Sequence, residues 1–520
     1  MCGVYFPGTV DTIKETAGGI TMENRGGFGS AKLPSDELKT NLEYIRNLFT
    51  GDETIQFRHL TSPYQTDWRF CLVYADGMVN NRIVNADVIR PLLEYRFPER
   101  PGDPAEFISQ HVMFSDGSEK TAEVEKIVQG LVYGDSVLLI DGCAEALVLN
   151  TKGWAMRSIE EPESERSLRG PREGFNESIL TNLSMLRRKL RTPDLKFHYR
   201  TFGRRSRTKI CVCYLDSLIN HDVLTELEKR LDDIDIDATL DSNYITEIIR
   251  DKTYSPVKTI GSTERPDVVA SKLLEGRIAL FVDGSPTVLT MPHLFIEHFQ
   301  ADEDYYINYV FASIGRMLRI LSFFVSISMP AIYVALVTFH QEMLPTPSLL
   351  SIITARQGVP FPTALETLFM IIVFEMLRES GARMPGLMGQ ALSTVGALVI
   401  GQAAVDAKIV SAPIIIIVAF TGIAGLMVPK IKGFVIMMRF LLLGFSCVLG
   451  IYGYLLGVIA MLTALFGTSS FGVPIMPDVY ADDAQDYKDI YWRTSWKKML
   501  RRPKLLSWNH NRQATKGKAK

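Results

Sequence analysis

Ionisable side chains interrupt an apolar helical stretch at Thr363 to Pro385, TALETLFMIIVFEMLRESGARMP. Such groups are costly at membrane depth and normally face protein or water. One stripe of the expected helix combines aliphatic and charged side chains: Leu368, Ile371, Glu375, Arg378 and Glu379. If several copies surrounded an axis, Glu375 and Glu379 would form acidic rings that favour cations. The stripe is therefore a candidate pore lining.

The same spacing allows two other interpretations. Neighbouring charges such as Glu379 and Arg383 could pair locally on an interfacial or buried helix. A secondary transporter would instead use Glu366, Glu375 and Arg378 as an ion or substrate site near the bilayer midplane. Transporters often carry inverted repeats, and the apolar runs of this chain show no self-similarity.

Enzymatic sites have no comparable signal in the sequence. The chain has no glycine-rich phosphate loop, no HExxH motif and no nucleophile elbow, so we expect no catalytic residue, no metal and no cofactor. Cys211 and Cys213 alternate along a probable strand and could touch a metal, but small buried core residues are the commoner outcome. The six cysteines have no framework spacing, which suits a reducing compartment.

Two parts of the chain differ in composition. Long apolar runs lie between residues 320 and 466, whereas residues 1–300 carry charges throughout. The formal net charge of −2 gives no indication of a nucleic-acid partner. The N-terminus has no basic region followed by an apolar run, so we expect no cleaved secretory signal.

Two pairs of segments recur at nearly one offset. CLVYADGMVN at 71–80 is similar to CVCYLDSLIN at 211–220, and GDSVLLIDGCAEALVL at 134–149 is similar to GRIALFVDGSPTVLTM at 276–291. Both pairs keep the same order, which indicates an internal duplication. We therefore expect an α/β soluble N-terminal region made of two related subdomains, followed by an α-helical polytopic membrane domain.

Six parts are expected along the chain: a mobile N-terminal arm (1–40), a cytoplasmic α/β subdomain 1 (41–160), a connector with a basic helix (161–200), a cytoplasmic α/β subdomain 2 (201–300), a membrane domain of four to six spans (301–470) and a basic cytoplasmic tail (471–520).

The connector contains the cationic turn RGPREGF at 169–175 and a helix that ends in basic residues. Positive charge there complements the helix dipole. Alternatively, the basic side chains form a docking surface for an acidic neighbour or the membrane. The docking candidates are Arg169, Arg172, Arg187 and Arg188.

Apolar stretches of about 20 residues are candidate transmembrane helices. They are Ile320–Phe339, Gly386–Val405, Ile409–Val428 and Gly433–Phe466. The last stretch is long enough for one tilted span, or for two short spans that break near Gly450 and Gly453. Because both terminal regions are expected to be cytoplasmic, the chain should cross the membrane an even number of times. Four spans plus a re-entrant segment, or six spans, both satisfy this condition.

The C-terminal tail is strongly basic. Residues 488–520 hold eleven Lys or Arg, which predicts a cytoplasmic location. Trp492, Trp496 and Trp508 interleave with these charges, a pattern that suits an interfacial helix on anionic lipid better than binding of nucleic acid.

Several longer phrases are spread over about residues 40–480: RGPREGFNESILTNLSMLRRKLRTPDLKF, GRIALFVDGSPTVLTMPHLFIEHFQADEDYY, TFHQEMLPTP, GVPFPTALETLFM, FEMLRESGARMP and VGALVIGQAAV. Together they resemble a known family, the A subunits of spore germinant receptors, or GerA family, of endospore-forming bacteria. One departure is Ile371, where the family often carries an acidic residue.

The resemblance implies a multi-pass subunit of a complex in the spore inner membrane, with both terminal regions on the cytoplasmic, spore-core side. Its implied partners are a permease-like B subunit, a lipoprotein C subunit, membrane lipids and further copies of itself as a homo-oligomer, without nucleic acid. Nutrients would trigger the complex, and the A subunit would form a ligand-gated cation channel. A non-conducting scaffold subunit is the alternative.

Overall fold

The computed structural model describes residues 31–98, 103–113, 118–153, 165, 169–251, 255–383, 399, 401–476, 489–496, 502 and 506. These residues form two compact units. One unit consists mainly of residues up to Lys152, and the other holds the rest of the chain together with the short segments Phe49–Gln56 and Asp76–Met78.

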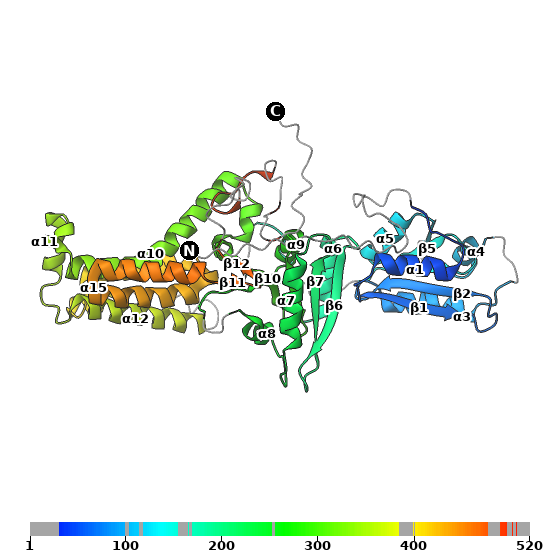
Figure 1. Ribbon diagram of the computed structural model, residues 1–520, viewed down its shortest axis with the longest axis horizontal. Coiled ribbons are helices and arrows are strands. Elements are labelled where there is room, and N and C mark those ends of the chain that lie inside the picture. The colour runs from blue at the N-terminus through cyan, green and yellow to red at the C-terminus, as the bar shows by residue number, and fades with distance from the viewer. Residues whose placement is uncertain are drawn as a thin grey trace, which may run out of the picture. The chain divides into compact units, whose positions relative to one another are not determined.

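The first unit is built on a five-stranded sheet in the order β1-β2-β4-β5-β3 (Figure 1). Apolar residues of β2 and β4 are buried in its core, as expected for central strands. Its elements are α1 (Leu38–Leu48), β1 (Ile55–Thr61), β2 (Arg69–Ala75), α2 (Asn81–Ile83), η1 (Val84–Ile89), α3 (Arg90–Glu94), α4 (Pro104–His111), β3 (Ser118–Thr121), α5 (Val124–Tyr133), β4 (Ser136–Ile140) and β5 (Ala146–Leu149).

A second five-stranded sheet has the equivalent order, β6-β7-β9-β10-β8, and all its neighbouring strands are antiparallel. The predicted duplication is therefore confirmed. The elements of this subdomain are α6 (Ile179–Lys189), β6 (Leu195–Phe202), β7 (Thr208–Leu215), α7 (His221–Asp232), α8 (Ser242–Ile249), β8 (Gly261–Thr263), α9 (Pro266–Leu274), β9 (Ile278–Val282) and β10 (Val288–Met291), followed by η2 (Phe295–Phe299) and η3 (Asp302–Tyr305).

The basic helix α6 is the first helix of the second subdomain and not part of a connector. Its Asn182 donates to the carbonyl of Asn176 at 2.6 Å, as Asn41 of α1 donates to Ser35 at the same distance. The first N–H of each helix donates to the turn aspartate of its own sheet, at 3.1 Å in the first copy and 3.2 Å in the second. The expected connector at 161–200 therefore contains the start of the second copy.

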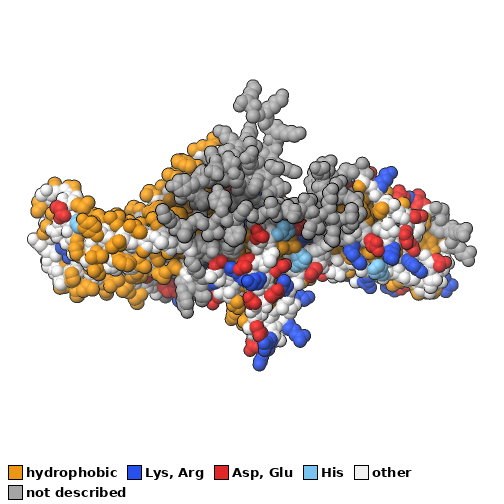
Figure 2. Space-filling model, viewed as in Figure 1, with side chains coloured by type: hydrophobic (Ala, Val, Ile, Leu, Met, Phe, Trp, Pro, Cys, Tyr) orange, Lys and Arg blue, Asp and Glu red, His pale blue; other side chains and the backbone are white. Residues whose placement is uncertain are grey.

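The C-terminal region is helical. Its elements are α10 (Tyr309–Thr338), η4 (Gln341–Met343), α11 (Thr346–Ala355), α12 (Thr363–Arg383), α14 (Ala412–Leu426), η5 (Pro429–Ile431), α15 (Lys432–Phe466), β11 (Ser469–Ser470) and β12 (Val473–Pro474). Figure 2 shows hydrophobic side chains gathered over α10, α12 and α15.

Among the described residues, two helical runs are long and apolar enough to cross a membrane. They are Tyr309–Thr338 and Pro429–Phe466, while α11 and α14 are shorter apolar helices. The predicted span at 386–405 falls mostly outside the described residues, so four to six crossings stay a prediction.

The run α15 consists of two helices that fold back on each other at Gly450, whose φ of 59° and ψ of −135° are not helical. A Cβ on Gly457 would lie 2.7 Å from a methyl group of Leu442, although fifteen residues of straight helix would separate the two by about 22 Å. Figure 1 shows the two halves side by side. The expected break near Gly450 and Gly453 is thus present, and small residues let the two backbones approach.

We expect Gly453→Ala to destabilise this helical hairpin by about 1–3 kcal/mol through overpacking. The added Cβ would clash with the carbonyl oxygen of Phe445, so one helix must shift. Gly444→Ala is the matched control, because a Cβ there meets nothing within 4 Å. Thermal unfolding of the detergent-solubilised chain measures the difference, and equal melting temperatures for both variants would contradict this packing.

Candidate functional site

Helix α12 divides the predicted pore stripe between two faces. Leu368 is 36% exposed and Glu379 is exposed, whereas Ile371 is 1% exposed. Glu375 and Arg378 are also mostly buried. The exposed stripe of the helix comprises Leu365, Leu368, Phe369, Ile372, Met376, Glu379 and Arg383. It is rotated by roughly 100°, about one residue, from the buried members of the predicted stripe.

A buried guanidinium that was not among the predicted site residues joins three helices. Arg439 of α15 is 1% exposed and donates to the carbonyl of Ser326 in α10 at 2.8 Å and to its hydroxyl at 2.7 Å. It also donates to Glu375 of α12 at 2.7 Å. The lone arginine in FVIMMRFLLL was the available signal, since an isolated charge in an apolar run needs a partner.

Glu375 therefore has two cationic partners. Arg378 donates to its second carboxylate oxygen, which is the local pairing that the sequence allowed. A second local pair joins Glu379 and Arg383 at 2.9 Å on the exposed face. In a single chain Glu375 belongs to the interior of the bundle, and Glu379 is the acidic residue of α12 that stays exposed.

Glu366 lies at the other end of α12 and is fully buried. One of its oxygens accepts a hydrogen bond from the backbone N–H of Ser411, the residue that precedes α14. The other lies 3.8 Å from Arg356, which follows α11. This carboxylate therefore ties the start of α12 to α14 and to the end of α11.

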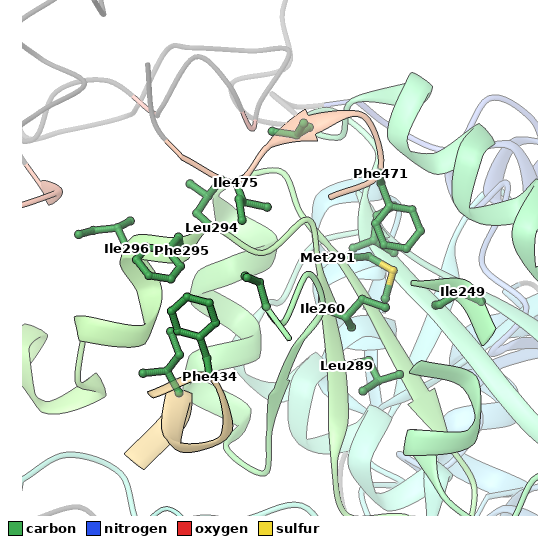
Figure 3. Packing of buried hydrophobic residues seen from close by; sticks show 14 of the residues in the cluster. Ile249, Ile260, Leu289, Met291, Leu294, Phe295, Ile296, Phe434, Phe471 and Ile475 are labelled. Carbon is green, nitrogen blue, oxygen red and sulfur yellow. The ribbon is translucent and has the colours of Figure 1, made fainter. Parts of the chain in front are cut away.

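The hairpin β11–β12 follows α15 and packs into the second subdomain (Figure 3). The Phe471 ring at its tip is buried beneath the guanidinium of Arg230, 4.5 Å away. The N–H of Phe471 donates to Asp251 at 3.2 Å, and the carbonyl of Ile475 accepts from Phe295 at 2.9 Å. The end of the last apolar helix is thus attached directly to the core of the second sheet.

A buried charge cluster reinforces this junction. Glu297 accepts from Lys272 at 2.6 Å and from Arg277 at 2.5 Å, and it lies 3.1 Å from a ring nitrogen of His293. Burial alone would raise the pKa of Glu297, but the charges of Arg277 and Lys272 hold that pKa well below its usual range. Burial lowers the pKa of His293 and, more strongly, that of His298.

These histidine pKa values predict acid sensitivity. An imidazole whose pKa is lower in the folded state binds fewer protons there than in the unfolded chain. The free energy of unfolding therefore decreases as pH falls below about 6.5. Glu297 adds a further loss only below about pH 4.5, through its own lowered pKa. We expect the melting temperature to fall between pH 7 and 5, and His298→Asn to reduce that fall. The exposed His221→Gln is the control, and an identical pH profile for wild type and His298→Asn would refute the assignment.

The four docking candidates occupy different environments. Arg187 is 2% exposed and donates to Asp52 at 2.7 Å and to Thr54 at 2.6 Å, so it ties the short segment Phe49–Gln56 to the second subdomain. Arg188 is partly buried, 3.7 Å from Glu173. Arg169 and Arg172 are exposed. Within one chain Arg187 therefore stabilises the fold, whereas Arg169 and Arg172 lie at the surface.

We expect Arg187→Leu to lower the free energy of unfolding by about 3–5 kcal/mol, because it leaves the carboxylate of Asp52 buried without its charged partner. Adding Asp52→Leu should recover part of that loss. Arg205→Gln, which removes a highly exposed arginine, should change little. Denaturant unfolding measures all three variants, and an Arg187→Leu single variant as stable as the Arg205→Gln control would exclude a structural role.

The described part of the tail packs on protein. Arg316 of α10 donates to the carbonyl of Asp489 at 2.5 Å, and Arg493 donates to the carbonyl of Ile307 at 2.8 Å. Trp492 and Trp496 are exposed, and Trp508 lies outside the described residues. Residues 489–496 do not form an α-helix, so the expected interfacial helix is absent from this segment, and binding of these rings to lipid stays a prediction.

The family model described as Bacillus/Clostridium GerA spore germination protein matches residues 43–505. The chain is 39% identical to "Uncharacterized membrane protein YfkQ" of Bacillus subtilis, covering 93% of this chain and 94% of that protein. It is 39% identical to spore germination protein KA of Bacillus subtilis (91% and 88% covered) and 34% identical to spore germination protein B1 of the same organism (90% and 96%).

Among solved structures, the chain is similar to the N-terminal domain of the A subunit of the Bacillus megaterium spore germinant receptor GerK3. The two are 33% identical with a TM-score of 0.41, and the match covers 51% of this chain and 98% of that domain.

Proposed function

The chain belongs to the Bacillus/Clostridium GerA family of spore germination proteins, and from this membership we propose that it is the A subunit of a nutrient germinant receptor. We further propose that copies of it assemble in the spore inner membrane into a ligand-gated cation channel. Family membership does not show that the A subunit conducts ions. The channel proposal is based on the geometry of α12.

The outward stripe of α12 is the observation that carries the channel proposal. Its apolar side chains, among them Leu368, Ile372 and Met376, are exposed in a single chain and lead to Glu379. Around a central axis, such a stripe would line a narrow apolar passage with a ring of Glu379 carboxylates at one end, each paired with Arg383. Carboxylates at this position would favour cations over anions. Copies packed side by side would also bury an apolar surface that is otherwise uncovered within the chain.

The five predicted pore residues then have two roles. Leu368 and Glu379 line the passage. Ile371 packs inside the bundle, and Glu375 and Arg378 brace the wall through their mutual pair and through Arg439. The bracing residues stabilise the orientation of α12 and thereby determine which face meets the axis.

Partner assignments are part of the proposal. A permease-like B subunit and a lipoprotein C subunit would complete the receptor, with germinant binding outside this chain. The exposed Arg169 and Arg172 are the proposed docking residues on the soluble region, which together with the tail would lie on the cytoplasmic side. The hairpin β11–β12 would carry movement between the second subdomain and the last apolar helix.

Neutralising the acidic ring should reduce cation flux. We expect Glu379→Gln to slow the release of monovalent cations from germinant-treated spores severalfold. The channel should also prefer cations over anions less strongly, because each copy loses one negative charge at the passage. Glu342→Gln removes another highly exposed carboxylate outside α12 and is the matched control.

Cross-linking of the same spores establishes whether each variant still assembles. Normal assembly together with unchanged release and selectivity in Glu379→Gln would remove the stripe from the pathway and favour the scaffold alternative.

A further inference from the structure

Two guanidinium groups share one carboxylate inside the helical bundle. Arg378 and Arg439 both donate to Glu375, and Ser326, the remaining partner of Arg439, is neutral. The nearby acids are engaged elsewhere, Glu366 with Ser411 and Glu379 with Arg383. Residues 384–398 and 400, which lie outside the described part, contain no Asp or Glu in their sequence. Among the described residues, the cluster therefore carries one positive charge in excess, which is unfavourable in an apolar surrounding.

The excess belongs to Arg378. All three nitrogens of the Arg439 guanidinium have an acceptor. Arg378 has one carboxylate oxygen and a ring contact with Phe374 at 5.9 Å, and its Nε has no acceptor among the described residues. A guanidinium offers five N–H donors, so Arg378 keeps donors that have no acceptor among the described residues.

The surroundings of Arg378 leave it accessible. Its side chain is 15% exposed, compared with 1% for Arg439. Helix α14 presents Gly425 at this point, where an added Cβ would lie 3.1 Å from the hydroxyl of Ser326 and 3.9 Å from Arg378 Nη1. Glycine thus lets the backbone of α14 lie close to Ser326 and to both guanidinium groups, next to the place where α14 ends.

This end of the bundle is also where a membrane surface would provide phosphate. α14 ends at Leu426, η5 carries Lys430, and α15 begins at Lys432. Arg439 lies seven residues into α15, about 10 Å along the helix, a depth from which arginine side chains reach the headgroup region. Basic side chains between helices near a membrane surface suit anionic headgroups.

We propose that Arg378 binds the phosphodiester of an anionic phospholipid at the exposed edge of its guanidinium, next to the end of α14. The flat fork of the guanidinium matches two phosphate oxygens, and one negative charge balances the cluster. A carboxylate from another chain could also neutralise the excess charge of the cluster. We favour lipid because Arg378 lies near the lysine-bearing end of the bundle, where anionic headgroups would be close. Bound lipid would then hold α12 against α14.

The test uses the purified full-length chain in a neutral detergent. Native mass spectrometry and the melting temperature are followed while phosphatidylglycerol, phosphatidylcholine or inorganic phosphate is added. We expect phosphatidylglycerol to be retained and to stabilise the chain, and Arg378→Gln to weaken its apparent affinity about tenfold. Arg378→Lys should weaken it less because the charge remains. Arg383→Gln, which removes a more exposed arginine of the same helix, should behave as wild type.

Three results would overturn the proposal. They are equal retention of phosphatidylglycerol by wild type and Arg378→Gln, equal stabilisation by inorganic phosphate at the same concentration, and a changed oligomer size in Arg378→Gln with unchanged lipid binding. The last would indicate a partner carboxylate. If Arg378→Gln does not fold, the wild-type chain can be cross-linked to phosphatidylglycerol that carries a photoactivatable headgroup. Cross-links should map to the ends of α12 and α14, and cross-links confined to other segments would refute the site.

Discussion

The pairing of charges inside an apolar helical bundle is the constraint on which the rest of this structure depends. Arg439 cannot remain isolated in that environment, and it binds Ser326 of α10 and Glu375 of α12 at once. Those contacts fix the rotation of α12 about its own axis. The rotation decides which side chains point inward, and it leaves an apolar stripe that ends in Glu379 on the outside. The proposed pore surface is therefore a consequence of a buried ion pair on the neighbouring face of α12.

A second constraint connects the helices to the soluble region. The hairpin β11–β12 places Phe471 in the core of the second subdomain immediately after the last apolar helix ends. Glu297 and its cationic neighbours lie in the same junction and have no freedom to move apart without exposing unpaired buried charge. The end of the helical bundle and the second subdomain therefore share one buried junction.

The two copies of the internal duplication share local hydrogen bonds but differ in their other contacts. Both copies use a buried asparagine at the first helix and a turn aspartate that accepts from its first N–H. The second copy adds Arg187 on that helix, which binds Asp52 from the segment leading out of α1. Repeated local geometry therefore coexists with contacts that only one copy makes, and charge that looked available for docking was used within the fold.

The sequence by itself determined the duplication, the separation of soluble and apolar regions and the family, and it offered a break near Gly450 as one of two alternatives. Each of these follows from local patterns, because repeated strands, apolar run length and glycine spacing act through neighbouring residues. The rotation of α12, the role of Arg187 and the importance of Arg439 were decided only by the tertiary structure. A helical stripe in a sequence gives the relative angles of side chains but not the direction of the interior. That direction depends on partners such as Ser326 and Glu375, which lie 113 and 64 residues away from Arg439 along the chain.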